Sequence, residues 1–189
     1  MNMEQPTQFL AERRIAILAT DGFEESELFE PKKALEAVGA VVEIVSIHGG
    51  EIKSWKGNNW GKSIGVDATV DETEAVKYDG LLIPGGVMNP DKLRMSKRAI
   101  EFVKEFVVDH KTIASICHGA QVLIEAGLTK GKHLTSWPSL KTDLINSGAD
   151  WVDEEVVVDD FLITSRKPDD LPAFNKKIIE GFSHSMRRI

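Results

Sequence analysis

Short apolar runs alternate along the chain with segments whose apolar residues recur every three or four positions. Residues 14–20, with the sequence RIAILAT, form a continuous apolar run that is typical of a buried strand. Similar runs at 41–47, 78–86 and 112–117 predict three more strands. Apolar spacing and helix-ending glycines predict helices over 96–110, 118–127, 139–149 and 171–186.

The segment 21–40 has a mixed pattern. Leu28, Leu35 and Val38 share one helical face, and Gly39 is placed to end the helix. Pro31 interrupts this pattern, because proline fits the first turn of a helix better than the interior. We therefore expect a short turn over 25–30 and a regular helix from about Pro31.

The remaining segments predict smaller elements. Residues 48–65 are rich in glycine and read as a hairpin or a long loop. Residues 66–72 and 133–137 are strand-like, and 154–166 reads as two strands around an Asp-Asp turn. Because strands alternate with helices throughout, we expect an α/β fold with a mostly parallel sheet covered on both faces. With no linker or repeat, residues 14–189 are expected to form a single domain that follows a polar N-terminal extension, 1–13.

Composition narrows the class of protein. The chain has 189 residues, 42% hydrophobic and 28% charged, which is typical of one globular domain. Its net charge of -7 argues against binding to the phosphate backbone of nucleic acids or to anionic membranes. No stretch approaches the roughly 20 apolar residues of a membrane span. The N-terminus lacks an apolar signal core and one cysteine cannot form an internal disulfide, so we expect a cytoplasmic location.

The only cysteine, Cys117, lies where the apolar run 112–117 becomes a helical pattern. A sharp strand-to-helix turn would expose its side chain above open helix amides, which stabilise a thiolate nucleophile. The alternative is a buried cysteine that only fills the core. His118 could serve as an acid or base beside the sulfur, or could instead cap or pack against a neighbouring loop.

Two other strand ends carry candidate chemistry, and in an open parallel sheet ligands bind beyond such ends. Glu24, Glu25 and Glu27 follow the first strand, and Glu25 is expected to be solvated. Glu27 or Glu24 can assist a thiolate only if burial keeps it protonated.

A Gly-Gly pair follows the middle strand. Gly85 and Gly86, together with the amide of His118, could hold an oxyanion, and Gly119 joins the expected substrate-binding set. The alternative is an ordinary turn. Neither a nucleotide-binding glycine pattern nor metal-ligand spacing among the histidines is present, so no metal or cofactor is expected.

The tryptophans lie in or near predicted loops. They could serve interfaces with partners, but packing at the edge of the core is the favoured interpretation. They are Trp55, Trp60, Trp137 and Trp151.

Several stretches, in this order, resemble the PfpI-type family of the class I glutamine amidotransferase-like superfamily. They are DGFEESEL, YDGLLIPGG, NPDKLR, ASICHGAQVL, GADWVDEEVVVDD and ITSRKPDDLPAFN. The resemblance implies a flavodoxin-like three-layer sandwich, a homodimer or larger assembly, and a nucleophile at Cys117 with Glu27 beside it and Glu24 close by. Members of the family are described as intracellular peptidases, cofactor-independent glyoxalases, deglycases and stress chaperones.

The chain departs from the family pattern at three points. Ala120 replaces a common proline, and the loop GGVMNPD is one residue longer than usual. In some relatives the acid after that proline reaches the histidine of a neighbouring subunit, and Asp91 is the matching position here. The His-x-Glu pair of true amidotransferases is missing, because Ser185 and Met186 follow His184, so glutamine hydrolysis is disfavoured.

These observations predict a stress-protective cysteine hydrolase or lyase that acts on small carbonyl adducts or on peptides. Glyoxalase and deglycase chemistry is favoured over peptidase chemistry. The main alternative is a non-enzymatic chaperone or redox sensor in which Cys117 is oxidised. A structural family member with an inert thiol is the third possibility.

Overall fold

A computed structural model describes residues 9–185. Its centre is a seven-stranded sheet in the order β11-β12-β8-β7-β1-β3-β6, in which only β11 runs antiparallel to its neighbour. These strands are β1 (Arg14–Leu18), β3 (Val41–Ser46), β6 (Ala68–Thr69), β7 (Gly80–Ile83), β8 (Thr112–Ile116), β11 (Val156–Asp159) and β12 (Leu162–Ser165). The predicted mostly parallel α/β sandwich is confirmed.

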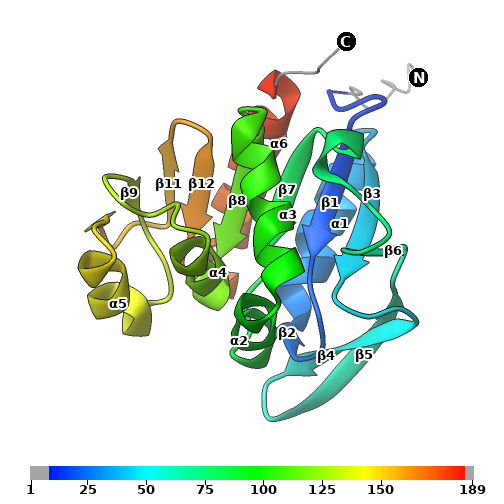
Figure 1. The fold of residues 1–189 in the computed structure, drawn as a ribbon, viewed down its shortest axis with the longest axis horizontal. Helices are drawn as coiled ribbons and strands as arrows, with labels where there is room; N and C mark the ends of the chain where they lie inside the picture. Colours follow the sequence, from blue (N-terminus) through cyan, green and yellow to red (C-terminus); the bar gives the residue numbers. More distant parts are fainter. Residues whose placement is uncertain (1–8, 186–189) are drawn as a thin grey trace, which may run out of the picture.

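Helices cover both faces of this sheet (Figure 1). On one face, α1 and α6 bury residues such as Leu35 and Phe174 against β1. On the other face, α3 and α4 bury residues such as Phe102 and Val122. The six helices of the described chain are α1 (Glu25–Ala37), α2 (Met88–Met95), α3 (Lys97–Val108), α4 (Ala120–Glu125), α5 (Lys141–Asn146) and α6 (Leu171–His184). The three layers explain why the central strands β7 and β8 are buried along their whole length.

Helix α1 differs from the expectation. It is one helix from Glu25 to Ala37 with Pro31 inside it, not a turn followed by a helix. Pro31 removes one backbone hydrogen bond, yet it is buried on the same face as Leu28 and Leu35. Burial of this apolar face outweighs the lost hydrogen bond.

Helix α2 was not expected from the sequence, because Asn89 and Pro90 read as a loop signal. Pro90 instead occupies the first turn, where its missing N–H costs nothing. Helix α3 then begins after Ser96, whose Oγ accepts a hydrogen bond from the Ala99 amide at 3.2 Å. Of these two helices, α2 directly follows the Gly-Gly turn, and α3 packs on the face of the sheet.

The glycine-rich segment forms the hairpin that the sequence allowed. It consists of β4 (Glu51–Lys56) and β5 (Asn59–Gly65), and β2 (Phe23–Glu24) pairs with β4. A second small sheet joins β9 (His133–Leu134) to β10 (Asp150–Trp151). Figure 1 shows the hairpin at the end of the molecule toward which the β1 and β8 arrows point. The hairpin therefore overhangs the carboxyl edge of the central sheet.

The described part of the N-terminal segment packs on the domain. Leu10 is fully buried, and its amide donates to the carbonyl of Val38. The guanidinium of Arg13 donates to the carbonyls of Ser183 and Ser185 at 3.1 and 2.9 Å. Within residues 9–185, no helix has the length and apolar character needed to cross a membrane.

Candidate active site

Three neighbouring parallel strands, β1, β7 and β8, deliver the predicted site residues to one cleft. The cleft has a volume of about 360 Å³ and is open to solvent. Its lining residues are Glu24, Glu27, Trp55, Gly57, Gly86, Val87, Cys117, His118, Trp137 and Pro168. The predicted convergence of an acid, a glycine turn and the thiol at this sheet edge is confirmed.

Cys117 sits on a sharp backbone turn. Ile116 is extended, whereas Cys117 has φ 62°, in the left-handed region that non-glycine residues rarely adopt. A short 3-10 turn over Cys117–Gly119 leads into α4. Gly119 makes this turn possible, because a Cβ there would lie 2.7 Å from the carbonyl of Ile83 and from Ser115 Oγ. Gly119 therefore serves close backbone packing under the nucleophile, and it does not line the cleft.

Glu27 lies in the first turn of α1 and is fully buried. Its Oε2 accepts a hydrogen bond from the Gly85 amide at 2.8 Å. Its Oε1 has no hydrogen-bonding partner among the described residues. Burial raises the pKa of Glu27 to about 8, although the Cys117 thiol and the Gly85 amide offset part of the shift. Glu27 is thus mostly protonated at neutral pH, as the proposed chemistry requires.

Cys117 differs from the sequence expectation. Burial raises the pKa of its thiol, and negative charge on Glu27 raises the pKa further. Backbone amides of His118 and Gly86 lower it but do not outweigh burial. The predicted exposure of the side chain is therefore wrong, because Cys117 is buried and its burial opposes a thiolate at this turn. Because two adjacent buried anions are unfavourable, the Cys117–Glu27 pair retains at least one proton at neutral pH.

The two glycines of the Gly-Gly turn have different roles. The Gly85 amide binds Glu27, so the expected oxyanion role is wrong for Gly85. Gly86 has φ 80°, lines the cleft and directs its amide toward the Cys117 sulfur, as His118 does. Two amides therefore remain to stabilise an oxyanion beside the nucleophile.

His118 contacts both the thiol and the opposite wall of the cleft. Its Nδ1 lies 3.4 Å from Cys117 Sγ. Its ring stacks on Trp137 with a centroid distance of 5.9 Å and an interplanar angle of 24°. Burial lowers the pKa of His118, so the ring is neutral at pH 7. His118 therefore both contacts the thiol and packs on a neighbouring loop, and its role as an acid or base stays a prediction.

The other two glutamates have separate environments. Glu24 lines the cleft, and burial raises its pKa while a hydrogen bond from Ser26 opposes the shift. Glu25 is buried, not solvated as expected. It accepts hydrogen bonds from the Lys62 amide at 2.8 Å and Ser54 Oγ at 2.9 Å, and it pairs with Lys56. Glu25 therefore anchors the β4–β5 hairpin over the cleft.

The structure does not bring Asp91 to this cleft. Asp91 is exposed in the first turn of α2 and is not a lining residue. Sequence reasoning missed Asn89, which holds the Gly-Gly turn, and the cleft-lining role of Trp55, Trp137 and Pro168. The tryptophans were noted only as interface or core-edge residues. The one signal that the sequence offers for Asn89 is its position as a polar residue immediately before Pro90.

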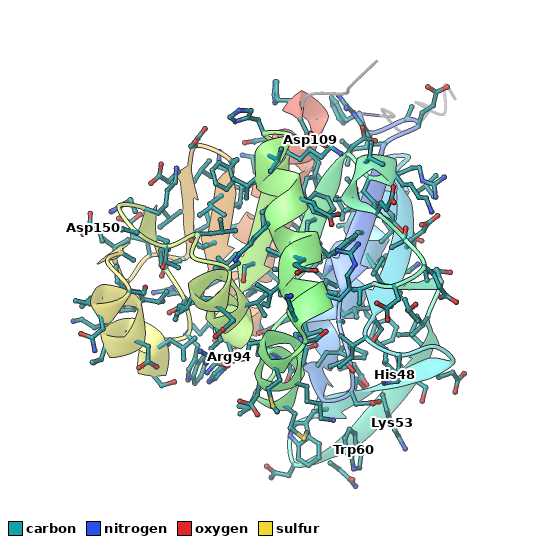
Figure 2. The ribbon with its side chains drawn as sticks, in the orientation of Figure 1. His48, Lys53, Trp60, Arg94, Asp109 and Asp150 are labelled. Atoms are coloured by element: carbon teal, nitrogen blue, oxygen red, sulfur yellow. The ribbon has the colours of Figure 1, made fainter. Side chains whose placement is uncertain are left out.

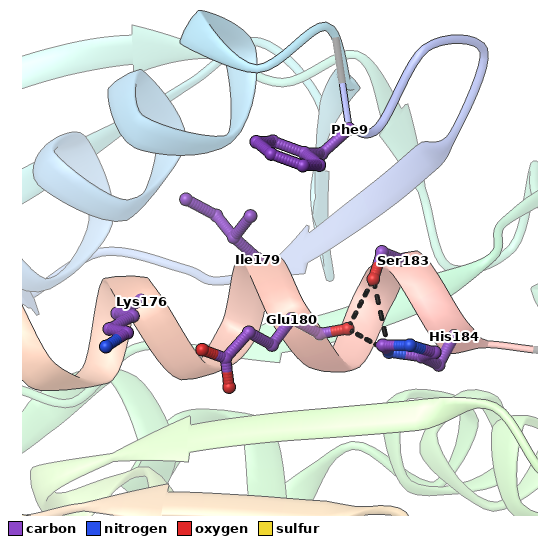
Figure 3. Close-up of a pocket in the computed structure, with 6 residues that line it drawn as sticks. All are labelled: Phe9, Lys176, Ile179, Glu180, Ser183 and His184. Atoms are coloured by element: carbon purple, nitrogen blue, oxygen red, sulfur yellow. Dashed lines mark hydrogen bonds between the residues drawn. The ribbon is translucent and has the colours of Figure 1, made fainter. Parts of the chain in front are cut away.

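A second hollow, of about 500 Å³, lies between Phe9 and α6 (Figure 3). Two of its polar groups are engaged within α6: Ser183 Oγ donates to the Glu180 carbonyl at 2.6 Å, and His184 Nδ1 lies 2.8 Å from the same oxygen. It shares no lining residue with the cleft beside Cys117. Among residues 9–185, no group of three His, Cys, Asp or Glu side chains is arranged to hold a metal ion.

Comparison with known proteins agrees with this geometry. The sequence model of the DJ-1/PfpI family matches residues 13–181. General stress protein 18 of Bacillus subtilis is 43% identical over 87% of this chain and 95% of its own. Protein/nucleic acid deglycase 2 of Escherichia coli is 41% identical over 88% and 96%. The crystal structure of Drosophila melanogaster DJ-1beta superposes with a TM-score of 0.82 at 29% identity and covers 91% of both chains.

Proposed function

Because the chain belongs to the DJ-1/PfpI family, we propose that it is a cysteine-dependent hydrolase that converts 2-oxoaldehydes to 2-hydroxy acids. The substrate is the free aldehyde or its adduct with an amine or a thiol. The observation that carries the proposal is the Cys117 thiol beside the buried, protonated carboxyl group of Glu27. The sulfur of Cys117 can form a bond to a carbon atom of the substrate, and the carboxyl group of Glu27 can move protons at that carbon.

The first step is addition of the Cys117 sulfur to the aldehyde carbon. The thiol proton leaves through Glu27, and the substrate oxygen, held by the amides of Gly86 and His118, receives a proton in return. The product is a hemithioacetal. Where the substrate is an amine adduct, the carbon–nitrogen bond breaks instead and the departing amine takes the proton.

The second step moves hydrogen between two substrate carbons. Glu27 as carboxylate removes the proton from the sulfur-bearing carbon, which gives an enediol, and then delivers a proton to the neighbouring carbon. The result is a thioester of a 2-hydroxy acid. Water hydrolyses the thioester, which restores the Cys117 thiol. The net reaction adds one water and needs no external oxidant or reductant. Because the pKa of Glu27 is about 8, both of its protonation states are accessible near neutral pH.

The experiment is turnover of methylglyoxal, and of its adducts with a thiol and with an amine, followed by assay of the hydroxy acid formed. We expect Cys117→Ala to abolish turnover and Glu27→Gln to lower kcat by at least about 100-fold. Glu30→Gln, an exposed carboxylate on the same helix, serves as the control and should retain activity. Equal residual rates in the wild type and Cys117→Ala would overturn the proposal.

The redox-sensor alternative uses the same residues. An oxidised sulfur could be held by the amides of Gly86 and His118 and by the unpartnered Oε1 of Glu27. Oxidation of Cys117 without catalytic turnover of any 2-oxoaldehyde would favour this alternative. Peptide hydrolysis ranks lower, because a single cysteine in a cleft of about 360 Å³ does not by itself explain peptide recognition.

We also propose a homodimer or larger assembly. An exposed Asp91 outside its own cleft is consistent with a role at the site of a neighbouring subunit. Sedimentation of the wild type, combined with activity of Asp91→Asn, tests this role. We expect the substitution to lower activity without changing the environment of Cys117 in its own chain.

A further inference from the structure

Four of the residues that line the active-site cleft have apolar side chains. This aromatic wall consists of Trp55, Val87, Trp137 and Pro168. Its members come from the β4–β5 hairpin, the loop after β7 and the segments that precede α5 and α6. The chemistry proposed for Cys117, Glu27 and the two amides requires none of these four side chains. The cleft, at about 360 Å³, is in the range of sites that enclose ligands of drug size, roughly 300–1,000 Å³. A small 2-oxoaldehyde fills only part of it.

Neighbouring groups hold both tryptophans of the aromatic wall in place. The backbone amide of Trp137 donates to the carbonyl of Cys117 at 3.2 Å, and its ring stacks on His118. Trp55 contacts Trp60 edge to face at a centroid distance of 5.4 Å and an interplanar angle of 82°. Figure 2 shows Trp60 on the hairpin that carries this pair. Such preorganised rings bind a partner without a large cost in side-chain entropy.

The charges of the residues that line the cleft limit which substituents can bind against the aromatic wall. The ionisable residues that line the cleft are Glu24, Glu27, Cys117 and His118, and none of them is a lysine or arginine. The hairpin carries Lys53, Lys56 and Lys62, but none of them lines the cleft, and Lys56 is paired with Glu25. A negatively charged substituent would therefore lose its hydration with no cation to replace it. A flat uncharged ring would instead bury apolar surface against Trp55 and Trp137.

We propose that the aromatic wall is a specificity subsite for an uncharged aryl group carried by the reacting carbonyl compound. The preferred substrates are then aryl-substituted 2-oxoaldehydes and their adducts. The inference rests on the proposed function and adds its substrate class. The chemistry is unchanged: the sulfur adds to the aldehyde carbon, a proton moves between the two carbons, and water releases the aryl 2-hydroxy acid. The ring takes no part in bond making.

The test compares kcat/KM for phenylglyoxal, methylglyoxal and 4-carboxyphenylglyoxal in the wild type, Trp55→Leu and Trp137→Leu. The ratio of phenylglyoxal to methylglyoxal is taken within each variant, because the two aldehydes differ in intrinsic reactivity. We expect each substitution to lower this ratio by about tenfold, mainly through KM for phenylglyoxal. The carboxylated compound should be the poorer aryl substrate in the wild type. Trp137→Phe should keep most of the preference, since it keeps a ring.

Phe9→Leu is the control, because Phe9 is exposed and lies outside this cleft. It should leave the ratio unchanged. If methylglyoxal is turned over but the ratio is the same in the wild type and both tryptophan variants, the subsite is overturned and the proposed function stands. If the wild type turns over none of the aldehydes, the proposed function fails and the subsite fails with it.

Discussion

The side-chain amide of Asn89 donates a hydrogen bond to the carbonyl oxygen of Gly85 at 3.1 Å. The same nitrogen donates to the carbonyl of Pro84 at 2.9 Å, and Oδ1 accepts from the Thr20 amide at 2.8 Å. Asn89 is fully buried. One side chain therefore ties the end of β1 to the turn after β7, and it fixes the turn that presents Gly86 to the nucleophile.

Asn89→Asp keeps the size of this side chain but replaces its donors with a carboxylate that faces two carbonyl oxygens. We expect a loss of about 2–4 kcal/mol in the free energy of unfolding and at least a tenfold fall in kcat/KM. Urea titration and methylglyoxal turnover measure the two effects. Asn146→Asp makes the same chemical change on the exposed surface of α5 and should have little effect. Wild-type activity in Asn89→Asp would show that the turn does not depend on this amide.

The raised pKa of Glu27 makes the stability of the protein depend on pH. The native state holds the Glu27 proton up to about pH 8, whereas the unfolded chain releases it near 4.5. The stability that the raised pKa of Glu27 contributes to the folded state is therefore complete below pH 4.5. It is lost as the pH rises to about 8, and the free energy of unfolding falls by about 1.4 kcal/mol per pH unit over this range.

Glu27→Gln should remove that slope, because the amide cannot titrate and its oxygen can still accept from the Gly85 amide. Urea unfolding between pH 5 and pH 8 compares the two proteins. Parallel pH profiles for wild type and variant would mean that Glu27 titrates normally in the folded protein.

Glu25 gives a pH effect of the opposite sign. Hydrogen bonds from the Lys62 amide and the Lys56 ammonium, together with the Ser54 hydroxyl, lower the pKa of Glu25 to about 2. Its contribution is present above pH 4.5 and is lost as pH falls toward 2. At pH 7, Glu25→Gln should cost about 1.5–3 kcal/mol. The loss should appear as faster hydrogen exchange at the Lys62 amide, while α3 keeps its protection. Unchanged exchange at Lys62 would show that this carboxylate does not hold the hairpin.

Gly119→Ala tests the packing beneath the nucleophile. The added Cβ would lie 2.7 Å from the Ile83 carbonyl and from Ser115 Oγ, so the turn that carries Cys117 must shift. We expect a loss of about 1–3 kcal/mol in stability and a larger proportional loss in kcat. Gly65→Ala is the matched control, because a Cβ there meets no atom within 4 Å. A fully active and stable Gly119→Ala protein would contradict the close packing.

The sequence pattern was sufficient to predict a mostly parallel sheet covered on both faces and a strand-to-helix turn at Cys117, but not the order of the strands. Continuous apolar runs identify strands buried on both faces, and the change of period at Cys117 marks a strand-to-helix turn. Pro31 misled the prediction of α1, because a local rule about proline cannot measure how much apolar surface the helix buries. Asn89 was missed because its partners, Thr20 and Gly85, lie on other strands.

By itself, the sequence determined the alternation of strands and helices, the single thiol at the end of β8 and the acids after β1, because those features depend on local periodicity and residue order. Only the tertiary structure decided the protonation of Glu27, the burial of Glu25, the assignment of the Gly85 amide to Glu27 and the aromatic wall beside Cys117. Each of these depends on which distant groups exclude water or donate hydrogen bonds. Desolvation and contact between remote segments are set by packing, which the order of residues along one segment does not contain.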